Sequence, residues 1–202
     1  MSTRHLRPPL AALALFALAS GALGGEGRAQ RRDAEALKVK VAAITAFAER
    51  PRRQLQQTTV TETELNAYLM YDALTELPVG VVDPALTILG TGRVSGRAVV
   101  DLDAVRKERK PASILDPMNY LSGRLPITAT GLLTTSNGMG RFALESAAIA
   151  SIPVPKVVLQ EIVSFYSRTP EKPSGIGLDD PFALPAKIRE IHVERGQAVV
   201  VQ

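Results

Sequence analysis

Apolar positions near the start of the chain follow a helical period. Between Asp33 and Arg50 they recur at intervals of three or four residues, which predicts an amphipathic helix. Asp33 stands where a helix N-cap belongs, and Pro51 cannot continue the helix. The preceding stretch 20–32 is rich in Gly, Ala and Arg, and we expect it to be disordered. The apolar stripe consists of Leu37, Val41, Ile44 and Ala48.

Two further segments have helical patterns. Thr61 and Glu64 have the spacing of a capping box, in which each side chain accepts a hydrogen bond from the backbone of the other residue. The helix that follows is expected to end near Leu77. Pro155 fits the first turn of another helix, which runs to about Arg168 with a wide apolar face. That face belongs either to a core helix, which we expect by default, or to a lid over an apolar pocket.

The middle of the chain has the alternation of strands. Apolar residues of one parity between Leu86 and Leu102 predict one face of a strand pair. Three glycines share that parity, and glycine permits a sharp bend or a close backbone approach. They indicate either a strongly curved sheet or an ordinary turn or bulge around Thr91. The apolar residues are Leu86, Ile88, Val94, Ala98, Val100 and Leu102, and the glycines are Gly90, Gly92 and Gly96.

Two hairpins are predicted beside this pair. Apolar and polar residues alternate from Arg124 to Thr134. Asn137 and Gly138 then form the strongest hairpin signal in the chain, because both positions of a type I′ turn need positive φ. The chain returns antiparallel to Ile152. The other predicted strands are 57–60 and a closing hairpin of 188–194 and 197–202.

The remaining connections carry charge and turn residues. We expect a charged loop at Arg106 to Lys110, a short helix at Pro111 to Tyr120, and a loop rich in Pro, Gly and Asp at Thr169 to Pro181. The basic run could contact anionic lipid headgroups. Such clusters are more often solvated, and Glu108 dilutes the charge of this one.

The order of these elements predicts an α+β fold. Glycine-punctuated apolar strands follow a helix, and a tight hairpin, a second amphipathic helix and a last hairpin come after them. We expect a strongly curved antiparallel sheet wrapped around a long helix, with an additional N-terminal helix. The chain divides into a signal peptide (1–29), a disordered start with the N-terminal helix (30–56) and a single domain (57–202).

The first residues have the features of an export signal. A basic start precedes an apolar run from Leu10 to Ala19, which is shorter than the roughly 20 residues that span a bilayer. Cleavage could follow Ala19 or Ala29, and the alternative is an uncleaved anchor. The chain has no cysteine, which favours a bacterial periplasm over a pathway that forms disulfides. Without cysteine, the protein also cannot be anchored as a lipoprotein.

Charge and aromatic content argue against a nucleic-acid partner. The 202 residues include 24 basic and 20 acidic side chains, and the net charge of +4 is not concentrated in one patch. Tryptophan is absent, and the few Phe and Tyr residues do not form a stacking platform. Nucleic-acid binders need a dense basic surface, so we exclude that class.

No catalytic or metal-binding cluster is apparent. His192 is the one histidine beyond the expected signal peptide, and a strand histidine between two apolar residues is usually structural. It has no neighbouring nucleophile motif, and a zinc site would lack ligands. Asp101 and Asp103 could form a carboxylate pair on one strand face, yet their parity predicts a solvated outer surface. We therefore predict a protein that is not an enzyme and has no cofactor or metal.

These residues resemble the small periplasmic tubular lipid-binding proteins of bacteria. That group includes the LmeA-like phospholipid-binding family and other members or relatives of the TULIP superfamily. The resemblance covers about 57–202 and implies a long helix wrapped by an antiparallel sheet, with an elongated apolar groove for phospholipid. The chain departs from the lipoprotein members by lacking their lipidated cysteine, and it has the additional N-terminal helix. The matching segments are 60–66, Gly90–Asp103, Leu125–Ile152, Pro155–Tyr166 and Ile188–Val201.

We therefore predict a periplasmic protein that binds or transfers phospholipid, or a similar apolar ligand, in an elongated hydrophobic groove. Transient contact with a membrane surface is compatible with that role, and no protein partner is indicated. The alternative is a cell-envelope scaffold or assembly factor whose core is filled by its own side chains. The residues expected to line the groove are Leu65, Leu69, Ile88, Val100, Leu102, Ile127, Leu144, Leu159, Ile162 and Phe165.

Overall fold

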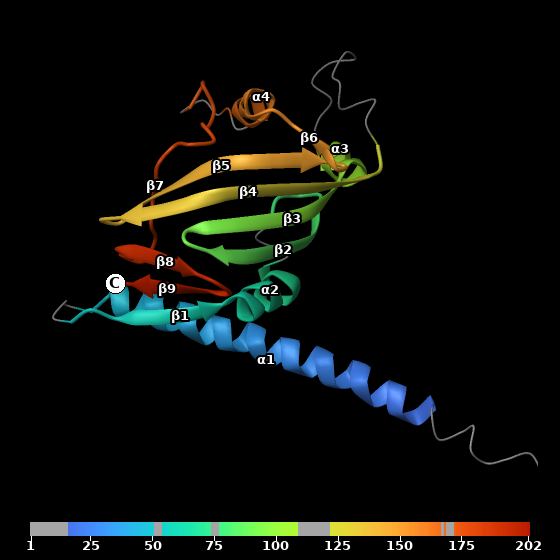
Figure 1. Ribbon diagram of the computed structural model, residues 1–202, viewed down its shortest axis with the longest axis vertical. Coiled ribbons are helices and arrows are strands. Elements are labelled where there is room, and N and C mark those ends of the chain that lie inside the picture. Colours follow the sequence, from blue (N-terminus) through green and yellow to red (C-terminus); the bar gives the residue numbers. More distant parts are fainter. Residues whose placement is uncertain (1–15, 51–53, 74–76, 109–121, 167, 169–171) are drawn as a thin grey trace, which may run out of the picture.

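The computed structural model describes residues 16–50, 54–73, 77–108, 122–166, 168 and 172–202, with the backbone alone at 16–26, 108, 162, 165 and 166. Within these residues, helices and two antiparallel sheets form an α+β fold, which confirms the predicted class (Figure 1). The larger sheet has the strand order β2-β3-β4-β5-β6, with β7 also paired to β5, and the smaller sheet has the order β1-β9-β8.

The strands are β1 (Gln57–Thr61), β2 (Val81–Gly90), β3 (Arg93–Asp101), β4 (Arg124–Ser136), β5 (Met139–Ile149), β6 (Ile152–Pro153), β7 (Phe182–Ala183), β8 (Glu190–Glu194) and β9 (Gln197–Val201). The helices are α1 (Phe16–Ala48), α2 (Glu62–Tyr71), α3 (Leu102–Glu108) and α4 (Lys156–Tyr166).

The larger sheet has one apolar face and one polar face. Residues paired directly across antiparallel strands point to the same side, so the register defines rows of side chains. On the polar face, Arg93 forms two hydrogen bonds of 2.8 Å with Glu145, and Thr130 donates one of 2.9 Å to Ser95. The apolar face is made of three rows: Leu86, Gly96, Ala129 and Ala147; Ile88, Val94, Gly131 and Leu144; and Ala98, Ile127 and Ile149.

The predicted parity of β2 and β3 is confirmed, but the predicted curvature is wrong for the described residues. Neither sheet is strongly curled, and neither wraps around a long helix. Gly90, Thr91 and Gly92 have positive φ of 96°, 54° and 80° and form the turn between β2 and β3, which is the alternative reading of these glycines. Leu102 does not continue β3, because it begins α3.

Helix α1 is longer than predicted. It extends from Phe16, so 20–32 is helical and not disordered, and Asp33 lies inside the helix and not at its N-cap. Contact with α2 gives a physical reason for the extension. The Arg31 guanidinium lies 4.9 Å from the centre of the Tyr71 ring, where a cation is attracted by the aromatic face. Such a contact between distant segments leaves no periodic signal in the sequence.

The second half of α1 packs against the smaller sheet. The Gln202 side chain is 3% exposed and donates hydrogen bonds to the carbonyl oxygens of Ile44 and Ala186, at 3.0 and 2.7 Å. The Lys187 ammonium donates to the carbonyl of Ala48 in the last turn of α1, where the helix dipole favours a positive charge. This region contains the buried hydrophobic cluster of Ile44, Leu184, Ile188 and Val200.

Several local predictions are confirmed. Thr61 and Glu64 form the capping box at the start of α2. Asn137 and Gly138 have φ of 49° and 80° in the turn between β4 and β5. The closing hairpin is present as β8 and β9, and α4 lies within its predicted span. Helix α2, however, ends at Tyr71, well before Leu77.

The run predicted as a charged loop, Arg106 to Lys110, begins inside helix α3. Arg106 and Lys107 lie in the last turn of α3, where positive side chains complement the helix dipole. The rest of that run and the short helix predicted at 111–120 fall on 109–121, outside the described residues.

Helix α2 joins the two sheets through its first two turns. The carboxylate of Glu62 accepts a 2.6 Å hydrogen bond from the backbone N–H of Ile88. The side-chain amide of Asn66 forms a pair of bonds with Leu86, accepting from its N–H at 2.7 Å and donating to its carbonyl at 2.8 Å. These side chains satisfy backbone groups that the edge strand β2 would otherwise leave unpaired. The polar residues of the 60–66 motif therefore have a structural role.

Candidate functional site

A groove of about 580 Å³ lies over the apolar face of the larger sheet. We call it the apolar groove. Its walls are Leu69 from α2, Leu159 from α4 and Leu178 from the loop that follows α4. That loop is bonded to α4, because the backbone N–H of Leu178 donates to the Gln160 side chain at 2.8 Å. Sites for small apolar ligands have volumes of roughly 300–1,000 Å³, so the apolar groove is large enough to be one.

Small residues form the floor of the apolar groove. Gly96, Ala129 and Ala147 stand side by side in one row across β3, β4 and β5. A Cβ atom built on Gly96 would meet no heavy atom within 4 Å. The floor is therefore low at this row, and the larger side chains of Ile127 and Leu144 stand on either side of it.

The lining brings almost no polar chemistry into the apolar groove. Arg97 and Thr128 belong to the lining, yet they pair with each other in a row of the opposite parity. Their side chains consequently point to the polar face, and they contribute backbone to the groove floor. No other charged residue is among the described lining residues. The apolar groove can bind by exclusion of water, but it holds no acid, base or nucleophile.

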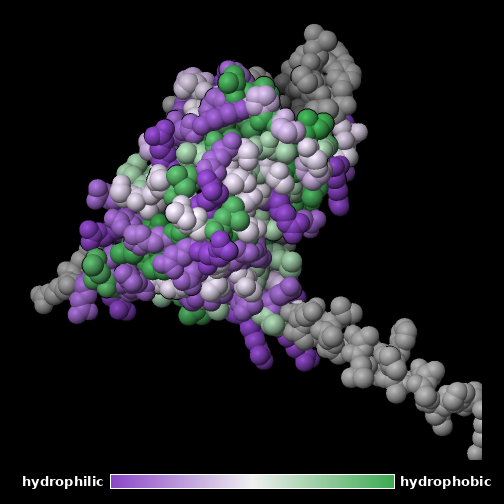
Figure 2. Space-filling model, viewed as in Figure 1, coloured by the Kyte–Doolittle hydropathy of each residue, from purple (hydrophilic) through white to green (hydrophobic). Residues whose placement is uncertain are grey.

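The apolar groove is open to solvent. Leu86, Ile127 and Leu144 are only half-buried, although they lie on the apolar face. In contrast, the buried hydrophobic cluster is formed where α1 packs against the smaller sheet. On the face shown in Figure 2, hydrophobic residues are scattered among hydrophilic ones and do not form one patch. Each Å² of apolar surface left in water costs about 25 cal/mol, so a ligand covering this groove would be favoured.

The structure brings together four of the ten predicted groove residues. Leu69, Ile127, Leu144 and Leu159 line the apolar groove. Leu65, Ile88, Val100 and Leu102 are not among the described lining residues of this groove. Ile88 and Leu102 are 4% and 7% exposed and are part of the packed interior. Ile162 and Phe165 lie in α4, but their side chains are outside the described residues.

The prediction missed the small floor residues and several larger lining residues, among them Phe142 and Leu178. Gly96 was recognised only as a residue of the inner parity, and Ala129 and Ala147 carry no signal for a site by themselves. Phe142 shares the face of Leu144 across a register shift at Thr130–Gly131, which alternation alone does not reveal. Leu178 comes from a loop, whose placement depends on contacts with α4.

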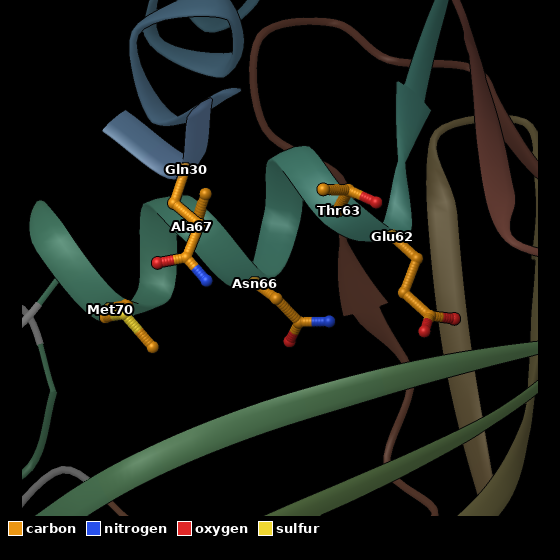
Figure 3. Close-up of a pocket in the computed structure, with 6 residues that line it drawn as sticks. All are labelled: Gln30, Glu62, Thr63, Asn66, Ala67 and Met70. Atoms are coloured by element: carbon orange, nitrogen blue, oxygen red, sulfur yellow. The ribbon is translucent and has the colours of Figure 1, made fainter. Parts of the chain in front are cut away.

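A second, smaller pocket of about 250 Å³ lies between α1 and α2 and is more polar (Figure 3). In Figure 3 the side chains of Glu62 and Asn66 extend from α2 toward the strand beside it. Both are already hydrogen bonded to the backbone of β2. We therefore assign these polar side chains a structural role, which is to attach α2 to the larger sheet. Its lining is Gln30, Glu62, Thr63, Asn66, Ala67 and Met70.

The candidate acids do not form a site. Asp101 and Asp103 were expected on one strand face, but Asp103 lies in α3. The Asp101 carboxylate accepts a 3.0 Å hydrogen bond from the backbone of Ala104, and this bond, followed by that of Arg124, holds its pKa below the usual range. Asp103 accepts hydrogen bonds from Arg106 and from the backbone of Gly123. Both carboxylates thus have structural roles at the N-terminal end of α3.

His192 also lies apart from any catalytic group. Its side chain is 57% exposed on β8, with Nε2 3.3 Å from a carboxylate oxygen of Glu190. Across the described residues, no three His, Cys, Asp or Glu side chains gather in a way that could hold a metal ion.

Within the part of the chain that the structure describes, none of the helices is both long and apolar enough to cross a membrane. Comparison of the chain with protein-family models, with curated proteins and with solved structures gives no match.

Proposed function

We propose that the protein binds an apolar ligand, such as an acyl chain of a phospholipid, in the apolar groove and carries it without chemical change. The observation that carries this proposal is the half-buried apolar floor under a groove of about 580 Å³, with no charged side chain pointing into it. Water in such a groove lacks hydrogen-bond partners, so an apolar ligand can displace it with a gain in free energy.

In a tubular lipid-binding protein, a strongly curved sheet around a helix would enclose the ligand. The apolar groove of this protein is instead open on one side. We propose that the ligand lies on the sheet, between Leu69 of α2 and Leu159 of α4. Export to a bacterial periplasm, after removal of 1–29, belongs to the same proposal. It is supported by the basic and apolar character of the first residues and by the absence of cysteine.

The test is native mass spectrometry, with organic extraction, of the full chain expressed in a bacterium and purified from its periplasm. We expect a stoichiometric apolar ligand to copurify with the protein. In Gly96→Leu, a leucine side chain would fill the lowest part of the floor, and the copurifying ligand should be shorter or less abundant than in the wild type. Thr87→Leu is the matched control, because Thr87 is exposed on β2 with the parity of the polar face.

The outcomes separate the proposal from its alternative. A folded protein that carries no lipid and takes up no added lipid would overturn the ligand-binding role. It would favour the alternative, a cell-envelope scaffold or assembly factor with protein partners. A mass of the purified chain that retains residues 1–29 would contradict the proposed cleavage.

A further inference from the structure

We infer that the apolar groove accommodates one acyl chain at a time, with the head of the lipid left in solvent. The expected ligand is therefore a single-chain amphiphile, or a membrane phospholipid that inserts one of its two chains. This inference rests on the proposed function and makes it more specific, because a protein that enclosed a whole phospholipid would need a larger cavity and polar groups for the head.

The volume of the apolar groove limits the number of ligand carbon atoms that it can hold. An apolar cavity of about 150 Å³ holds one benzene, which is about 25 Å³ per carbon. At that packing, the 580 Å³ of the apolar groove hold roughly 23 carbons. The acyl chains that form a hydrocarbon core about 30 Å thick commonly have about 16 carbons each, so the two chains of one phospholipid have about 32. One chain fits, and a second would leave much of its length in water.

The lining keeps the head outside. Arg97 is the one charged residue among the described lining residues, and its side chain belongs to the polar face. Burying a phosphate or carboxylate without a partner costs far more than the chain gains by burial. The head must therefore stay at the open side of the groove, and binding should respond to chain length and not to head chemistry.

The experiment is a competition assay in which ligands displace the apolar fluorophore N-phenyl-1-naphthylamine from the full-length protein. Two series are used below their critical micelle concentrations: saturated fatty acids and lysophosphatidylcholines with chains of about 8–24 carbons. Affinity should rise about fourfold for each added methylene while the chain is still being buried. It should then reach a plateau near the capacity of the groove, about 23 carbons, at the same length in both series.

Two variants test whether the plateau reflects the capacity of the apolar groove. Gly96→Leu adds four carbons to the floor and should shorten the plateau length by about four carbons, at about 25 Å³ each. Gly96→Ala adds one carbon and should shorten it by about one, which keeps the test available if the leucine variant does not fold. Thr87→Leu on the polar face should leave the plateau unchanged.

The results that would overturn the inference differ from those that would overturn the proposed function. Affinity that is still rising without a plateau at about 24 carbons, the longest chains tested, or two chains bound per protein, would show that the groove takes more than one chain. A strong preference for fatty acids over lysophosphatidylcholines of equal length would show that the head is recognised. In both cases the ligand-binding role stands. Failure of both series and of the fluorophore to bind would remove that role itself.

Discussion

The Lys40 side chain connects three elements through one charge. Its ammonium lies 2.7 Å from both carboxylate oxygens of Glu64 and 2.7 Å from the carbonyl oxygen of Thr59. Burial would raise the pKa of Glu64, but the hydrogen bonds from Lys40 and from the backbone of Thr61 outweigh it and hold that pKa below 4.5. A carboxyl group with a lowered pKa stabilises the fold above its ordinary pKa, and this contribution is lost as pH falls through the folded value.

We expect Lys40→Met to lower the free energy of unfolding by about 1–3 kcal/mol at pH 7, because it leaves the Glu64 carboxylate without its cation. Urea denaturation at pH 7 and at a series of values between 5 and 3 would measure it. The wild type should lose stability over the acid range, and the variant should lose less, since the pKa of Glu64 is then no longer lowered by Lys40.

Lys38→Met is the matched control for this experiment. Lys38 pairs with Glu35 and Asp72, but its side chain is 44% exposed, so solvent screens these contacts and the unfolding midpoint should change little. Equal losses in the two variants, or identical pH dependence in Lys40→Met and wild type, would show that burial of the Glu64 pair has no special role.

The side-chain amide of Asn66 forms the two hydrogen bonds with the backbone of Leu86 that a neighbouring strand would otherwise form. Its substitution by alanine leaves both the N–H and the carbonyl of Leu86 without their partner and should lower the free energy of unfolding by about 2–3 kcal/mol. Thr63→Ala, on the same helix at an exposed position, should have a much smaller effect. Urea denaturation at pH 7 would compare the two, and similar midpoints would contradict the role of Asn66.

At the scale of elements, α4 and the loop after it form one bonded unit. The Gln160 side chain accepts from the N–H of Leu178 and donates to the carbonyl of Ile176, at 2.8 and 3.3 Å. Lys156 and Asp179 form an ion pair at 2.6 Å. This unit supplies one wall of the apolar groove, so its attachment should influence ligand binding.

We expect Gly175→Ala to separate the loop from α4. Gly175 has φ of 73°, and a Cβ there would overlap the carbonyl oxygen of Ser164. The loop must then move, so amide hydrogen exchange at 172–178 should accelerate at least tenfold, while the strands of the larger sheet keep their protection. Ligand affinity should fall several-fold. Ser174→Ala is the control at an exposed neighbouring position, and unchanged exchange in Gly175→Ala would contradict the bonded unit.

The elements that sequence predicts best are those specified by local chemistry. Thr61 and Glu64 cap their own helix, and Asn137 and Gly138 make their own turn. The apolar parity of β2 and β3 identifies which face is buried, but it cannot say what covers that face. Ile127 of β4 therefore lines the apolar groove, whereas Val100 of β3, which has the same parity as the other inner residues, does not. The extension of α1 and the position of Leu178 depend on contacts between distant segments, which one sequence does not contain.

In the whole molecule, the buried core and the apolar groove lie in different places. The hydrophobic cluster around Ile44 and Val200 belongs to α1 and the smaller sheet. The larger sheet keeps its apolar face half-buried beneath the groove. This separation means that a change in the groove floor, such as Gly96→Leu, can alter binding while the core remains intact.

A bound ligand should therefore stabilise one part of the protein more than the other. At a free concentration of 100 times the dissociation constant, a ligand that binds only the folded state adds about 2.7 kcal/mol to the free energy of unfolding. We expect slower amide hydrogen exchange in β4, β5 and α4 when lysophosphatidylcholine is added, with little local change in β8, β9 and the second half of α1. Gly96→Leu should show a smaller stabilisation at the same ligand concentration, because its groove is partly filled. Protection confined to α1 and α2 would instead place the ligand in the smaller pocket between these two helices.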